Sequence, residues 1–124
     1  MKIFVLLGSI FALIGVAAGA YGAHGLPDHL GDDMVGYWQT AVQYQMYHAL
    51  ALFGAAWLHS QTEAISALVA GWCFAAGILV FSGSLYILVL TGSRGLGAVT
   101  PVGGLAMMIG WLGCILAALK LGST

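Results

Sequence analysis

Residues 65–90 read ISALVAGWCFAAGILVFSGSLYILVL, an apolar stretch that contains no charged residue. A helix needs about twenty apolar residues to cross the hydrocarbon core of a bilayer, so this stretch is long enough to span a membrane. Three similar stretches lie at residues 3–21, 40–58 and 99–119, and every charged residue falls outside all of these segments. The sequence therefore predicts an all-α integral membrane protein, an antiparallel bundle of four transmembrane helices.

The composition of the chain agrees with a membrane environment. Of the 124 residues, 61% are hydrophobic and 6% are charged, whereas about a quarter of a soluble globular domain is charged. The length allows four spans with short connections, so we expect a single membrane domain over residues 1–124 without a soluble catalytic domain. A net charge of −1, with no run of Lys or Arg, gives nucleic-acid binding no electrostatic basis.

The first stretch has two interpretations. Lys2 followed by an apolar run that ends with Ala18 and Ala20 also fits a cleavable secretory signal. Against this, small residues at three- and four-residue spacing favour a retained helix that packs closely on a neighbour. The glycines that we expect at such helix contacts are Gly15, Gly19, Gly83, Gly103 and Gly104.

The loops set the predicted orientation. With four spans, Lys2 and Lys120 lie on one side and Arg94 on the other, so the positive-inside rule places both termini in the cytoplasm.

The first loop ends with Tyr37 and Trp38, aromatic residues of the kind that sit at membrane interfaces. We therefore expect a short interfacial helix over residues 28–37.

Polar residues inside the spans mark where a site would lie, because each costs free energy in lipid unless it finds a partner. Tyr44 and His48 share one face of the second span. The third span carries hydroxyl groups past its middle, at a depth that matches this face. We expect one polar cluster in the outer half of the bundle, formed by His24, Tyr44, Gln45, His48, Ser82, Ser84 and Tyr86.

His48 has two interpretations as well. A neutral imidazole can relay a proton or bind a metal ion or haem iron, and His24 at the end of the first span would be the second ligand. An isolated intramembrane histidine is more often a hydrogen-bonded packing residue, and the chain has no closely spaced His or Cys/His pair of the kind that binds zinc. No cofactor is predicted. Cys73 and Cys114 lie within the third and fourth apolar stretches and are expected to be buried thiols.

Several short strings occur together in one known family, in the order found here. They are GAYGAHG at 19–25, TA at 40–41, YQ at 44–45, HAL at 48–50, FSGSLY at 81–86, LTG at 90–92, TPVGG at 100–104 and GW at 110–111. The chain thus resembles the domain of unknown function 423 family, small bacterial membrane proteins related to animal transmembrane protein 256. The resemblance implies about four membrane helices in the bacterial plasma membrane, with the first helix retained. It implies no reaction.

Three classes of function remain open. The first is a structural or accessory protein, in which the polar cluster fixes the bundle and the glycine faces dock onto copies of itself or onto a larger membrane complex. The second is an oligomeric channel or transporter for ions or small solutes. The third is a binder of haem, metal or a lipophilic cofactor through His24 and His48. An enzyme is not expected, because no nucleophile, base and oxyanion site can be assembled from the sequence.

Overall fold

The computed structural model describes residues 2–28 and 30–122, and all regular structure in these residues is helical. A π-helical turn joins α3 to α4 without a break in the helix, and a short 3₁₀ segment precedes α5. The elements are α1 (Lys2–His24), α2 (Asp32–Thr62), α3 (Ile65–Gly77), η1 (Ile78–Ser82), α4 (Gly83–Thr91), η2 (Arg94–Ala98) and α5 (Thr100–Ala118). The predicted all-α class is confirmed.

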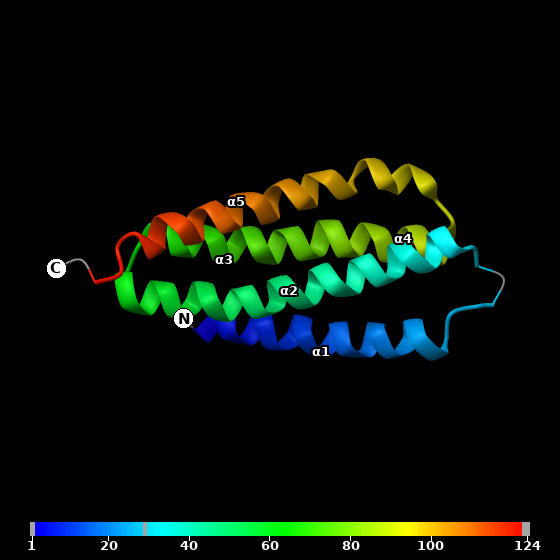
Figure 1. Cartoon of the computed structure of the whole chain (residues 1–124), viewed down its shortest axis with the longest axis horizontal. Helices are drawn as coiled ribbons and strands as arrows, with labels where there is room; N and C mark the ends of the chain where they lie inside the picture. The colour runs from blue at the N-terminus through cyan, green and yellow to red at the C-terminus, as the bar shows by residue number, and fades with distance from the viewer. Residues whose placement is uncertain (1, 29, 123–124) are drawn as a thin grey trace.

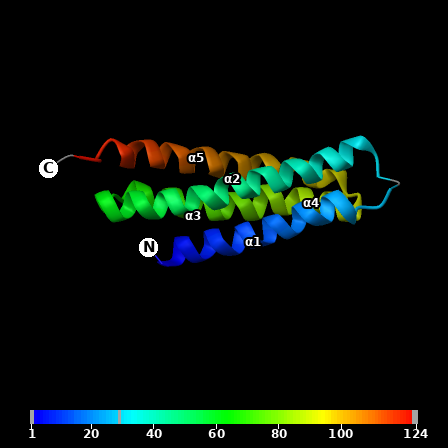
Figure 2. The same ribbon diagram turned by 60° about the horizontal axis from the view of Figure 1, so that its bottom comes forward.

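The helices lie side by side as long rods, and the chain reverses direction at each loop (Figure 1 and Figure 2). α1 packs mainly on α2, and α5 packs mainly on α3. α2 also contacts α3, η1 and α4, and thus lies between α1 and the rest of the molecule. The first and last helices consequently occupy opposite sides of the bundle.

Three helical segments are long and apolar enough to cross a membrane, namely Lys2–His24, Ile65–Thr91 and Arg94–Ala118. α2 is longer than any of the other helices but is not among these segments. Gln43, Gln45 and His48 lie in its middle and lower its hydropathy. Length and composition alone therefore identify three membrane-capable helices in the described part of the chain.

The predicted interfacial helix over residues 28–37 is wrong as a separate element. Asp32 is already the first residue of α2, which continues without interruption to Thr62. Its second turn is fixed by Trp38, whose indole N–H donates to the carbonyl oxygen of Ala18 at 2.9 Å. Trp38 is 6% exposed and also packs on the ring of Tyr86. These contacts hold the start of α2 against α1 and α4, so this segment is part of the bundle and not a separate helix lying along the membrane surface.

Glycines allow close helix contacts at most of the predicted positions, but not at all of them. A Cβ atom on Gly103 would come within 2.8 Å of the Cα atom of Phe81. Gly15 faces Met46, and Gly19 faces Val42. A Cβ atom on Gly83 would meet no atom within 4 Å, so the prediction of a packing role for Gly83 is wrong for contacts within the described chain. Gly104 makes only ordinary contacts with the ring of Phe81.

Candidate functional site

Gln45 links three segments of the bundle. Its side chain is 2% exposed, and its amide nitrogen donates to the carbonyl oxygen of Phe11 on α1 at 2.7 Å. Its amide oxygen accepts a hydrogen bond of 2.6 Å from the hydroxyl group of Tyr86 on α4. Both ends of the amide thus have partners, which offsets the cost of burying this group away from water.

Two serines of the continuous helix formed by α3, η1 and α4 face different neighbouring helices. Ser82 is buried and donates to the carbonyl oxygen of Ala41 on α2 at 2.7 Å. The Ser84 hydroxyl lies 2.6 Å from the hydroxyl of Thr100, at the first turn of α5. The π turn η1 ends at Ser82, and its wider turn changes the direction of the side chains that follow. One helix therefore forms polar contacts with α2 and α5 within a single turn.

His48 lies where α2, α3 and α5 meet. Its Nδ1 atom is 2.7 Å from the carbonyl oxygen of Tyr44, and its Nε2 atom accepts a hydrogen bond of 3.0 Å from the indole N–H of Trp111. A carbonyl oxygen can only accept and an indole N–H can only donate, so these partners require the neutral tautomer with its proton on Nδ1. The ring of Phe74 packs beside the imidazole, with centroids 5.5 Å apart. Both ring nitrogens are thus engaged inside the protein.

Tyr44 occupies the edge of this region. Its ring stacks on Phe81 at a centroid distance of 4.6 Å and lies 6.0 Å from the ring of His48. With 39% of its surface exposed, Tyr44 faces outward from the bundle. Its backbone carbonyl, rather than its phenol, makes the bond to His48.

His24 lies far from the other predicted residues. It is exposed in the last turn of α1, whereas Gly8 near the other end of α1 faces Ala49, the neighbour of His48. At a rise of 1.5 Å per residue, about fifteen residues of α1 separate the two histidines by roughly 20 Å. Two ligands of one ion must each lie about 2 Å from it, so the alternative interpretation of His24 and His48 as a ligand pair does not fit this structure. Within the described residues, no group of three or more His, Cys, Asp or Glu side chains could hold a metal ion.

The predicted polar residues therefore occupy separate contacts. Two bonds lie within the predicted set, from Tyr86 to Gln45 and between His48 and the backbone of Tyr44. Ser82, Ser84 and the Nε2 atom of His48 bond to residues outside the set. Apart from the contact between His48 and Tyr44, each of these bonds joins two different helices. The arrangement is a ladder of helix-to-helix contacts, with Tyr44 at its outer edge.

Sequence reasoning missed two of the groups that complete these contacts. Trp111 provides the donor to His48, although its only sequence signal is a place in the GW string at residues 110–111. Thr100, whose only sequence signal is its place in the TPVGG string, is the first residue of α5 and directs its hydroxyl to Ser84. Both partners come from α5, whose rotation about its own axis the sequence does not specify.

An ion pair joins the first turn of α2 to η2 at one end of the bundle. Arg94 Nη2 lies 2.7 Å from Asp33 Oδ2, and both side chains are about half exposed. This hydrogen bond holds the pKa of the Asp33 carboxyl group below its ordinary value. The pair places the start of α2 and η2 at the same end of the molecule, opposite the start of α1 and the end of α5 (Figure 1).

Comparison with known proteins gives one family. The model of the family described as "Protein of unknown function (DUF423)" matches residues 18–104. The UPF0382 membrane protein YwdK of Bacillus subtilis is 50% identical over 121 residues, covering 97% of this chain and 98% of the relative. A UPF0382 membrane protein of Staphylococcus epidermidis is 49% identical over 97% of this chain and 98% of its own length, and no solved structure matches. The chain therefore belongs to the DUF423 family, whose members are uncharacterised membrane proteins.

Proposed function

We propose that this protein is a structural or accessory component of the bacterial plasma membrane, in which α2 crosses the bilayer together with the three more apolar rods. The observation that carries the proposal is the internal pairing of the polar groups on α2. Gln45 has partners on α1 and α4, and His48 has a partner on α5. Groups that are hydrogen-bonded inside a bundle cost far less in lipid than unpaired groups.

The same pairing argues against a catalytic role. A general base or a nucleophile needs a free lone pair directed at a substrate, whereas both nitrogens of His48 already have protein partners. Cofactor binding through His48 would require breaking the bond to Trp111. The proposed role is therefore not enzymatic. The protein acts through contacts with other copies of itself or with other membrane proteins.

The proposed topology places both termini in the cytoplasm. The start of α1 at Lys2 and the end of α5 at Ala118 lie at the same end of the bundle (Figure 1), and Lys120 follows α5 directly. Four crossings return the chain to the side from which it started. The two lysines, against the single Arg94 of the opposite end, favour the cytoplasm for the termini.

Cysteine labelling tests the crossing of α2. In a background without Cys73 and Cys114, Gly31→Cys and Glu63→Cys lie at the two ends of this helix. In intact cells a membrane-impermeant maleimide should label the first variant, and the second only after the membrane is permeabilised. Equal labelling of both variants in intact cells would overturn the four-span topology.

Purification and flux measurements test the functional class. Protein purified in mild detergent should be colourless and free of stoichiometric metal, with or without His48→Ala. Reconstituted into vesicles, it should pass no protons or small cations above the level of empty vesicles. A flux or a bound chromophore that the His48→Ala substitution abolishes would replace the accessory role by transport or cofactor binding. Under the accessory role, chemical crosslinking in native membranes should give a stoichiometric complex, with another copy or a second protein.

A further inference from the structure

The bundle is open between α2 and α5. These two helices contact each other much less than either contacts its main neighbour, and a groove of about 750 Å³ lies between them. Its walls are mainly aromatic and apolar, and they include Tyr47, Leu105, Met108 and Trp111. The first three of these side chains are more than half exposed, so the groove opens on the outer surface of the bundle. With α2 crossing the bilayer as proposed above, this surface faces acyl chains.

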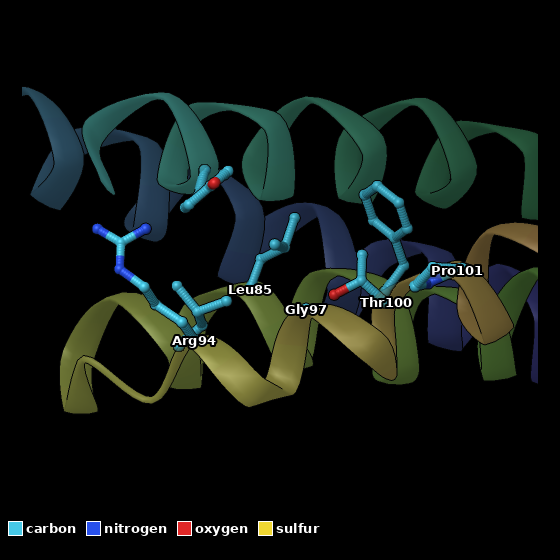
Figure 3. A pocket seen from close by; sticks show the side chains of 8 residues that line it. Leu85, Arg94, Gly97, Thr100 and Pro101 are labelled. Carbon is cyan, nitrogen blue, oxygen red and sulfur yellow. The ribbon is translucent and has the colours of Figure 1, made fainter. Parts of the chain in front are cut away.

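A second hollow of about 340 Å³ adjoins this groove toward the loop end of the bundle. The two share Phe81 and Pro101 as lining residues. Figure 3 shows Arg94 extending from the segment before α5 toward α2, with Leu85 and Thr100 further along the same hollow. The shared residues place the two hollows end to end as one path, with a cation at one end and mainly apolar walls along the rest.

The charge at the mouth of the path suits an anionic oxygen. Arg94 is 60% exposed, and one nitrogen of its guanidinium group bonds to Asp33. A guanidinium group carries five N–H donors in a planar fork, so it can bind a phosphate while it stays near a carboxylate. Asp33 then competes with the phosphate for the same cation. Loss of the Arg94 charge should therefore weaken phosphate binding, and loss of the Asp33 charge should strengthen it.

The length of the path suits one acyl chain. From Pro101 to Trp111 the lining positions of α5 advance about 15 Å, at 1.5 Å per residue. Half of a hydrocarbon core is also about 15 Å thick. The bond between His48 and Trp111 closes the inner end of the path near the middle of α5. An amphiphile with its phosphate at Arg94 would thus keep its chain within one leaflet.

We propose that the two hollows form one binding site for a glycerophospholipid, with the phosphate on Arg94 and one acyl chain in the groove between α2 and α5. Phe81 lies where the two hollows meet, in the π turn, and stacks on Tyr44. Its ring separates the part of the path that takes the glycerol backbone from the part that takes the chain. The bound lipid would cover the side of α5 that the protein leaves open.

Native mass spectrometry of delipidated protein in detergent tests whether Arg94 binds the phosphate of the lipid. The probes are dioleoylphosphatidylglycerol and dioleoylglycerol, which have the same chains and differ in the phosphate headgroup. The phospholipid should be retained one to one, about tenfold better than dioleoylglycerol, and Arg94→Gln should remove this preference. Asp33→Asn should increase phospholipid retention, because it releases the donors of Arg94. Equal retention of the two probes, or equal losses in both variants, would overturn the proposal.

A second pair of variants tests the groove. A Cβ atom on Gly104 would meet only the ring of Phe81, at 3.7 and 3.9 Å, so Gly104→Leu leaves the backbone in place and fills the groove. Gly54→Leu is the matched control, because Gly54 is exposed on α2 with no atom within 4 Å of an added Cβ. Gly104→Leu should weaken retention of both probes about fivefold, and Gly54→Leu should not. Unchanged retention in a folded Gly104→Leu protein would exclude the groove as the acyl-chain site.

Discussion

The hydroxyl group of Tyr86 donates a hydrogen bond of 2.6 Å to the side-chain oxygen of Gln45, and this contact joins α4 to α2 in the middle of the apolar bundle. The other end of the same amide reaches the backbone of α1. One side chain thus fixes the relative positions of three helices. Because lipid offers few alternative partners, such a bond specifies the packing more strongly than its small net free energy suggests.

Tyr86→Phe should lower the free energy of unfolding by about 1–2 kcal/mol, because it leaves the buried oxygen of Gln45 without a donor. Gln45→Leu should have a similar effect, and the double variant should lose less than the sum of the two. Reversible unfolding in mixed micelles gives these values. Tyr47→Phe is the control, since Tyr47 is 56% exposed, and strict additivity of the first two changes would contradict their coupling.

Trp111→Phe should leave Nε2 of His48 without a donor and destabilise the protein by about 1–3 kcal/mol. Nitrogen NMR of protein labelled at histidine should show the neutral Nδ1–H tautomer for His48, with an Nε2 shift that changes in this variant. The exposed Trp57 provides the control Trp57→Phe, which should change neither property. A His48 resonance of the opposite tautomer would contradict the hydrogen bonds described for this residue.

Arg94→Gln should raise the pKa of the Asp33 carboxyl group toward its ordinary value, because the hydrogen bond from Arg94 is the main cause of its lowering. A lowered pKa in the folded state stabilises the fold above the ordinary pKa of Asp, and this contribution is lost as the pH falls through the folded-state pKa. The stability difference between the wild type and the variant should therefore shrink in acid. Carbon NMR of the carboxyl group measures the shift, and Arg94→Lys should keep part of it.

Gly103→Ala should destabilise the protein by about 1–3 kcal/mol, because its new Cβ would overlap the backbone of Phe81 in the π turn. Gly83→Ala is the matched comparison, since its Cβ has open space and a helix interior favours Ala over Gly by about 0.5–1 kcal/mol. Thermal unfolding in detergent should place the two variants on opposite sides of the wild type. The same sign for both would argue against the close contact between α5 and η1.

The sequence by itself determined the environment of the chain and the approximate positions of its helices. Hydropathy is a local property that sums along the chain, so residues 65–90 already predict a helix close to the observed Ile65–Thr91. The polarity of α2 was visible in the same way. The start of α2 was misjudged because Trp38, read as an interfacial residue, is instead buried against α1 by a bond to Ala18.

Only the tertiary structure decided which polar groups meet. Pairing depends on the rotation and axial shift of each helix relative to its neighbours, and the spacing of residues within one helix does not contain this information. The π turn adds to the difficulty, because one wider turn redirects the side chains of Ser84 and Tyr86. The antiparallel packing of α1 on α2 separates His24 from His48, and the rotation of α5 brings Trp111 to the imidazole.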